Sequence, residues 1–126
     1  MLRYIELKTN QNDRGPAWIG RVQLSRSGRT VYFNGRAFKK CKGHCVNHFD
    51  IETGEEYWIS GVKKNGQDRH WAGSGKIIIE ASAVATYLKI VGVKELDPTR
   101  FVVSVNIKPA DPSKFHAFQN LELQQR

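Results

Sequence analysis

Two Asn-Gly dipeptides, at residues 34–35 and 65–66, separate segments in which apolar and polar side chains alternate. Alternation with a period of two indicates a strand with one buried face. Asn-Gly favours a two-residue turn between antiparallel strands, because both central positions of that turn need positive φ. The sequence therefore predicts a β-hairpin around each dipeptide. Their strands are expected at residues 29–33 and 36–40, and at 56–64 and 67–71.

Other segments carry the same strand pattern, and one carries a helix pattern. Strands with one buried face are expected at residues 2–8, 18–25 and 101–107, and a further strand is expected at 76–80. Apolar residues recur with the spacing of one helix face at Val84, Tyr87, Leu88 and Val91. Ser82 stands where an N-cap is expected, and Gly92 stands where a helix commonly stops. We therefore expect one amphipathic helix over residues 82–91.

The length of 126 residues is enough for one ordinary core, because a folded chain of this size buries about two-thirds of its surface. Short strands joined by tight turns, with one helix late in the chain, are typical of the α+β class. We predict a strongly bent antiparallel sheet, or a small β-barrel of short hairpins, with one late amphipathic helix. This single domain is expected over residues 1–108, followed by a surface tail at 109–126.

The apolar runs of the chain are short. Its first residues alternate charged and apolar side chains, whereas a secretory signal has an uninterrupted apolar region of about 7–15 residues. The longest apolar runs, 77–79 and 101–103, are far shorter than the roughly 20 residues that cross a bilayer. These patterns predict a cytoplasmic protein with no membrane partner.

The positive charge of the chain is concentrated in one segment. The net charge is +8, from 20 basic and 12 acidic side chains. Residues 14–49 contain no Asp or Glu, and their basic residues are Arg14, Arg21, Arg26, Arg29, Arg36, Lys39, Lys40 and Lys42. A field of one sign attracts polyanions, although charged faces also serve solubility alone. Aromatic residues lie among these cations, and surfaces that bind single-stranded nucleic acids combine cations with stacking aromatics.

The leading hypothesis is therefore a small basic module that binds RNA or single-stranded DNA through a basic and aromatic sheet face. The residues expected to bind are Arg21, Arg26, Arg29, Tyr32, Arg36, Lys39 and Lys40. The alternative is a protein-interaction module of the regulator or toxin-neutralising type, because an acidic partner is steered by the same field. The sequence leaves open the choice between these partners, and also the oligomeric state.

The second predicted hairpin, residues 56–71, has a tryptophan on each face. Exposing a ring of this size is unfavourable, so we expect one tryptophan in the core and the other lining a groove or covered by the helix. Such a groove suits base stacking or a small anionic ligand. Lys63 and Asp68 are positioned for a cross-strand ion pair. The candidate groove residues are Trp58, Lys63, Lys64, Asp68, His70 and Trp71.

Two cysteines and two histidines lie within eight residues, namely Cys41, His44, Cys45 and His48. All four are zinc-ligand types, but structural zinc sites usually bring two ligand pairs from separate segments. A loop without a cofactor is therefore the favoured interpretation, and a zinc site is the alternative. The chain contains no Gly-x-Ser-x-Gly or His-x-Glu motif. An enzyme is therefore the less favoured class, and no catalytic residue is nominated.

Residues 52–71, ETGEEYWISGVKKNGQDRHW, together with residues 28–33 and 73–77, resemble a family of small bacterial proteins of unknown function. The resemblance covers about residues 2–92. Some relatives carry the name deoxyxylulose-phosphate synthase. A thiamine-diphosphate enzyme of that type needs several cofactor-binding domains, and a single core of this size does not supply them. The resemblance therefore implies no activity and no site residues for this chain.

Overall fold

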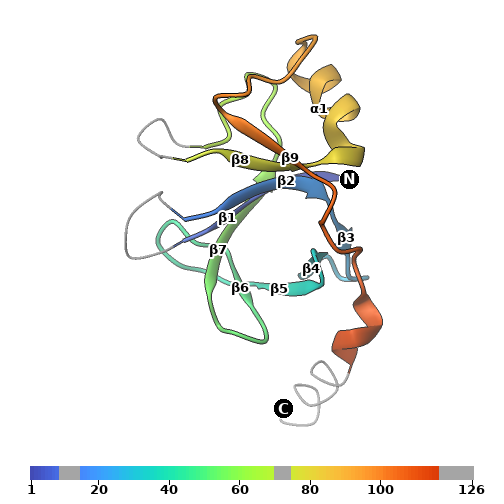
Figure 1. Ribbon diagram of the computed structural model, residues 1–126. Coiled ribbons are helices and arrows are strands. Elements are labelled where there is room, and N and C mark those ends of the chain that lie inside the picture. Colours follow the sequence, from blue (N-terminus) through green and yellow to red (C-terminus); the bar gives the residue numbers. More distant parts are fainter. Residues whose placement is uncertain (9–14, 70–74, 117–126) are drawn as a thin grey trace.

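The computed structural model describes residues 1–8, 15–69 and 75–116, which form one curled sheet with short helical segments (Figure 1). The strands are β1 (Leu2–Leu7), β2 (Ala17–Arg21), β3 (Gln23–Leu24), β4 (Thr30–Phe33), β5 (Arg36–Lys40), β6 (His48–Asp50), β7 (Glu56–Gly61), β8 (Ile77–Glu80) and β9 (Phe101–Ser104). The helical segments are the 3-10 helix η1 (Ala81–Ala83), the α-helix α1 (Val84–Val91) and the 3-10 helix η2 (Pro112–Phe115). The strands lie in the order β3-β4-β5-β6-β7-β1-β2-β8-β9.

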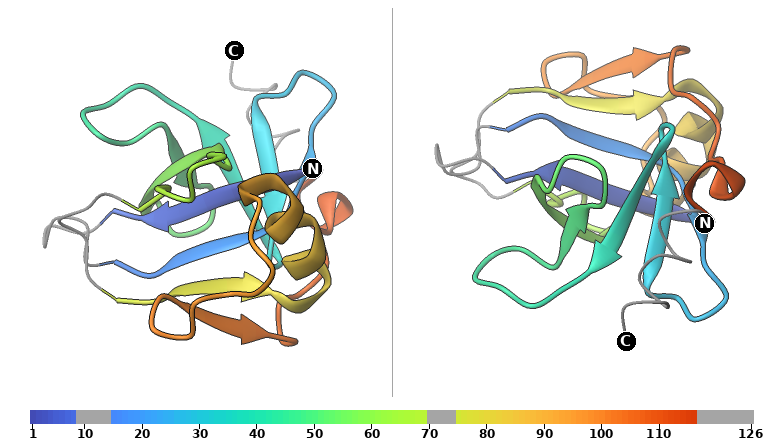
Figure 2. Two further views of the ribbon diagram at one scale, coloured as in Figure 1. Left: turned by 90° about the horizontal axis from the view of Figure 1, so that it is seen from above. Right: turned by 90° about the horizontal axis from the view of Figure 1, so that it is seen from below.

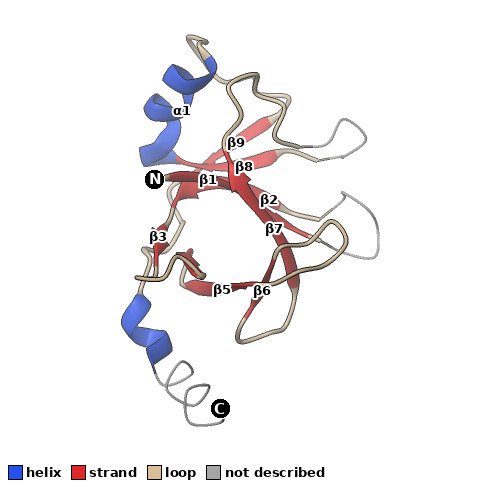
Figure 3. Cartoon of the chain, turned by 180° about the vertical axis from the view of Figure 1, so that it is seen from behind, coloured by secondary structure: helices blue, strands red, loops and turns tan. Residues whose placement is uncertain are grey.

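The sheet curls into a half-barrel because residues 17–24 form two consecutive strands that pair with different parts of it. β2 and β3 are separated only by Val22, yet β2 pairs with β1 while β3 pairs with β4. The strands from β1 to β7 therefore curve around a common interior (Figure 3). The α+β class with a strongly bent sheet, predicted from the sequence, is confirmed.

The interior of the curl is an apolar core that reaches across the sheet. Its buried residues are Ile5, Val31, Phe33, Phe38, Tyr57 and Ile59. The ring of Phe33 lies against the backbone of Gly20, and a Cβ atom at Gly20 would lie 2.3 Å from Phe33 Cε1. Residue 20 must therefore lack a side chain for β4 to approach β2 this closely.

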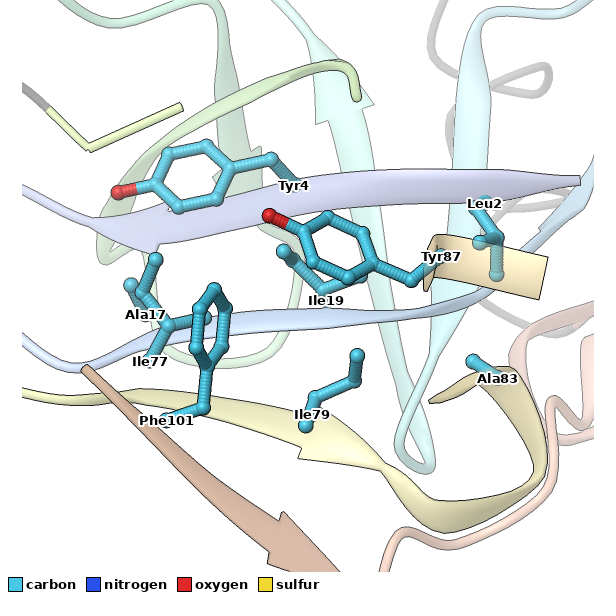
Figure 4. Packing of buried hydrophobic residues seen from close by; sticks show 9 residues of the cluster. All are labelled: Leu2, Tyr4, Ala17, Ile19, Ile77, Ile79, Ala83, Tyr87 and Phe101. Carbon is cyan, nitrogen blue, oxygen red and sulfur yellow. The ribbon is translucent and has the colours of Figure 1, made fainter. Parts of the chain in front are cut away.

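A second core covers the outer face of β1, β2 and β8. The helix α1 lies over this face (Figure 2), and the side chains that meet there are shown in Figure 4. They are Leu2, Tyr4, Ala17, Ile19, Ile77, Ile79, Ala83, Tyr87 and Phe101. β1 is thus buried on both faces, with Tyr4 in one core and Ile5 in the other, whereas the sequence predicted one buried face.

The helix ends as predicted and begins differently. Gly92 adopts φ 72°, and its N–H donates to the carbonyl of Leu88, so glycine terminates α1. Ser82 lies inside η1, and the N-cap of α1 is Ala83, which makes no side-chain capping bond. The expected N-cap role of Ser82 is therefore wrong, because the 3-10 turn carries β8 directly into the helix.

The first Asn-Gly hairpin is confirmed and the second is not. Asn34 and Gly35 have φ of 53° and 71°, as a two-residue turn requires. Gly66 also forms a turn, with its N–H donating to Lys63 O at 3.1 Å, but β7 ends at Gly61 and residues 62–69 contain no strand. Residues 70 and 71 of the expected second strand lie outside the described residues. β7 pairs with β1 from Tyr57 to Gly61, and its other edge is taken by β6 at Glu56 and Tyr57 and by the side chain of Asn47 at Ile59.

The sheet is antiparallel except at its last two pairings. β8 lies parallel to β2 and β9 lies parallel to β8. A parallel pair requires a long crossover, and the connection from β8 to β9 contains α1. Turn residues in a sequence indicate hairpins, whose strands are antiparallel. For this reason the sequence predicted a wholly antiparallel sheet. β9 forms the edge of the sheet, and its Val102 and Val103 are 46% and 51% exposed.

The segment after residue 108, predicted as a surface tail, packs on the sheet over part of its length. Phe115 in η2 is fully buried and lies against Tyr32 of β4, with ring centroids 6.1 Å apart. Tyr32, Ala37 and Phe115 form a small third cluster on the outer face of the β4–β5 hairpin. No helix in the described ranges is long and apolar enough to cross a bilayer.

Replacing Gly20 by alanine should destabilise the fold by about 1–3 kcal/mol, because overpacked cores show losses of this size. Equilibrium urea unfolding measures the loss. Gly61→Ala in β7 is the matched control, since a Cβ atom there meets only Arg3 Nη1, at 4.0 Å. The control should change stability by no more than about 0.5 kcal/mol. Equal losses in the two variants would contradict the Phe33 contact.

Candidate functional site

Four exposed cations gather at the open end of the β4–β5 hairpin. Arg26 and Arg29 belong to the turn before β4, and Lys40 and Lys42 to the end of β5 and the residues after it. The two segments are adjacent, because the N–H of Lys40 donates to the carbonyl of Arg29 at 2.8 Å. Among the described residues no acidic side chain forms an ion pair with any of the four. We call these four residues the basic rim.

The other predicted binding cations lie elsewhere or are already engaged. Arg21 donates through Nη2 to Ser82 O and Thr86 Oγ1, so it holds the start of the helical segment. Arg36 is paired with Asp50 at the opposite end of the hairpin, with Nη1 and Oδ2 2.7 Å apart. Lys39 is half-buried beside the rim. The predicted set is therefore divided among separate surfaces.

The aromatic residues of this region are packed inside the protein. Tyr32, Phe33 and Phe38 are only 3%, 2% and 1% exposed. Phe33 and Phe38 fill the interior of the curl, and Tyr32 is covered by Phe115. The expected stacking role of Tyr32 is corrected accordingly, because both faces of the hairpin are covered. The basic rim therefore presents guanidinium and ammonium groups to a ligand, and Tyr32, Phe33 and Phe38 are not available for stacking.

The candidate groove is partly assembled around a buried carboxylate. Trp58 points away from the interior core, is 38% exposed, and lies directly opposite Glu6 of β1. Glu6 is 2% exposed, accepts a hydrogen bond from the Tyr4 hydroxyl, and pairs with Lys8 at 2.9 Å. Burial, followed by the hydrogen bond to Glu6, raises the pKa of Tyr4 well above its usual range. Tyr4 and Glu6 were missed because their strand was expected to have one solvated face.

The charges of Arg69 and Asp68 also act on Tyr4, Arg69 lowering its pKa and Asp68 raising it. Asp68 is buried, and its Oδ1 accepts the backbone N–H of Lys63 at 2.7 Å, where an ion pair with the Lys63 ammonium was expected. Burial raises the pKa of Asp68. Arg69 donates to Gly15 O at 2.8 Å.

Of the six candidate groove residues, Trp58 therefore lies opposite Glu6, and the charge of Asp68 acts on Tyr4 of the same strand as Glu6. Lys63 and Lys64 are exposed. His70 and Trp71 lie outside the described residues.

The four candidate zinc ligands do not gather. Cys45 and His44 are exposed and Cys41 is half-buried. His48 belongs to β6, is 7% exposed, and its Nδ1 lies 2.8 Å from Asn47 Oδ1. Within the described ranges, no three His, Cys, Asp or Glu side chains are positioned to hold a metal ion.

No family model matches the chain, and no curated protein or solved structure is significantly similar to it.

The burial of His48 predicts a pH dependence of stability. Burial, and secondarily the charge of Lys40, lowers the pKa of His48 from 6.5 to about 4. The unfolded chain binds a proton there near pH 6.5, whereas the folded chain does not until about pH 4. The free energy of unfolding is therefore unaffected by protonation of His48 above about pH 6.5. It falls by up to about 3 kcal/mol as the pH drops from about 6.5 to about 4.

Urea unfolding at about pH 7.5 and about pH 5 measures this loss. His48→Gln should be less sensitive to pH than the wild type, and His44→Gln, at an exposed site, should behave as the wild type does. An NMR titration that gives the His48 ring a pKa near the ordinary 6.5 would contradict the expectation.

Proposed function

We propose that this protein binds the phosphate backbone of RNA or single-stranded DNA through the basic rim. The observation that supports this most is that four exposed cations, on two adjacent segments, form no ion pair with any described residue. They belong to the acid-free segment 14–49 of a chain with net charge +8. Cations that form no ion pair attract phosphates without first losing an acidic neighbour.

Binding of this kind is electrostatic and tolerant of sequence. Lysine and arginine that contact phosphates release condensed counterions, so affinity falls as salt concentration rises. Base stacking by aromatic side chains would add affinity, but Tyr32, Phe33 and Phe38 are buried. We therefore expect little discrimination among base sequences, because phosphate contacts carry no sequence information.

A second candidate function is the binding of a protein segment, and the edge strand β9 favours it. β9 exposes Val102 and Val103 on its two faces and has no neighbour on its outer side among the described strands. Open edges of this kind accept an added strand from a partner. Val103→Lys would abolish such binding and leave nucleic-acid binding intact, so the two functions are separable.

The proposal is tested by fluorescence anisotropy with a labelled single-stranded RNA, titrated between about 50 mM and about 200 mM salt. The combined variant Arg26→Gln, Arg29→Gln and Lys40→Gln should bind more weakly. The slope of log K against log salt should fall in magnitude by about 2, at about 0.7 for each lost phosphate contact on a single strand. Unfolding by urea confirms that the variant is folded.

The matched control removes the same charge elsewhere, at Lys76, Lys89 and Lys94, which are exposed residues of other segments. It should keep most of the affinity and the slope of the wild type. Equal weakening by both triple variants would show a diffuse charge effect and refute the rim as the site. Absence of binding by the wild type at low salt would refute the function.

A further inference from the structure

A hollow of about 300 Å³ lies at the tip of the β4–β5 hairpin, at the end away from the basic rim. Strands of this length separate the two ends by about 15 Å. The hollow is formed by the Asn34-Gly35 turn, the turn that follows β6, and the chain after β9. Its lining residues are Asn34, Gly35, Arg36, Glu52, Thr53, Lys108 and Lys114.

Three cations from three separate segments line this hollow, against one acid. Arg36 begins β5, Lys108 follows β9, and Lys114 belongs to η2, while Glu52 is the acidic residue. Residues so distant in sequence meet there because η2 is anchored on the hairpin by the buried ring of Phe115. The hollow is therefore built by the tertiary fold. Its three cations, set against Glu52 and the buried Asp50 that pairs with Arg36, leave a net charge of +1.

One buried carboxylate organises the wall that carries Arg36, Glu52 and Thr53. Asp50 is fully buried, and its Oδ2 accepts from Arg36 Nη1 at 2.7 Å. Its Oδ1 accepts the backbone N–H groups of Glu52 at 2.8 Å and Thr53 at 3.3 Å. The guanidinium is held by one of its nitrogens, and a guanidinium has five N–H donors. Arg36 therefore presents further donors in a fixed orientation.

The two lysines are held at the opposite wall by different contacts. The backbone N–H of Lys108 donates to Asn34 Oδ1 at 2.9 Å, and among the described residues no acid pairs with its exposed ammonium. Lys114 Nζ lies 3.2 Å from Gly35 O and 3.5 Å from Glu52 Oε1. An exposed pair of that length contributes little stability, so an incoming anion can replace Glu52 as the partner of Lys114.

A planar guanidinium beside ammonium groups is the donor set that binds phosphate groups in proteins. We propose that this hollow binds a terminal phosphate group, either of a small phosphorylated ligand or of the end of a nucleic-acid strand. Arg36 engages two phosphate oxygens, Lys108 and Lys114 neutralise the remaining charge, and the Thr53 hydroxyl lies on the same wall. The site is independent of the basic rim and does not rest on the proposed function.

Titration of isotope-labelled protein with inorganic pyrophosphate, followed by NMR, tests the proposal. We expect saturable shifts centred on the amides of Gly35, Arg36 and Thr53. The double variant Lys108→Gln and Lys114→Gln should weaken binding roughly tenfold or more, as loss of charge-assisted hydrogen bonds does. These lysines are exposed, so the variant should fold, whereas removing Arg36 would leave Asp50 buried without its partner.

The double variant Lys89→Gln and Lys94→Gln, at exposed positions, is the matched control, and it should bind pyrophosphate within about twofold of the wild type. The triple variant of the basic rim should also bind it normally, which separates this proposal from the function of the rim. Shifts that do not saturate, or equal weakening by the pocket and control variants, would overturn it.

A pair of oligonucleotides, one with a 5′-phosphate and one with a 5′-hydroxyl, identifies the source of the phosphate. Tighter binding of the phosphorylated strand that is lost in the Lys108→Gln and Lys114→Gln variant supports recognition of a strand end. Equal binding of the two strands, with pyrophosphate still bound by the hollow, supports a small phosphorylated ligand.

Discussion

The close approach of the Phe33 ring to the backbone of Gly20 joins two strands that are distant in the order of the curled sheet. β2 and β4 are not neighbours in the strand order, and they meet because the chain bends at Val22. The contact lies at the interior core and brings the β4–β5 hairpin against β2. Both the basic rim and the phosphate-sized hollow are carried by that hairpin, one at each end, so their positions follow from this packing.

Local signals in the sequence predicted local structure well and long-range pairing poorly. The Asn34-Gly35 hairpin and the helix stop at Gly92 depend on backbone conformations that those residues favour, and both are present. The turn at Gly66 also formed, but a turn does not specify which strands pair beyond it. β7 pairs with β1 and β6, and the parallel pairings of β8 and β9 have no short-range signature.

The positive charge of the candidate site could be predicted from the sequence, but the burial of individual residues in and near it could not. The cations of the rim belong to one acid-free segment that is visible without a structure. The burial of Tyr32 depends on Phe115, more than 80 residues later in the chain. Likewise, Glu6 is buried because a second core covers the outer face of β1, and a strand that is covered on both faces cannot be recognised from alternation alone.

The open edge at β9 makes the tendency of the protein to aggregate depend on its net charge. Edge strands with exposed apolar side chains are templates for pairing between molecules, and proteins usually protect them with charges or proline on the strand. Phe101–Ser104 carries neither. Repulsion between copies of net charge +8 acts in their place. Concentrated salt, or a polyanion bound at the basic rim, reduces that repulsion, so the neutralised complex is the species most prone to aggregate through this edge.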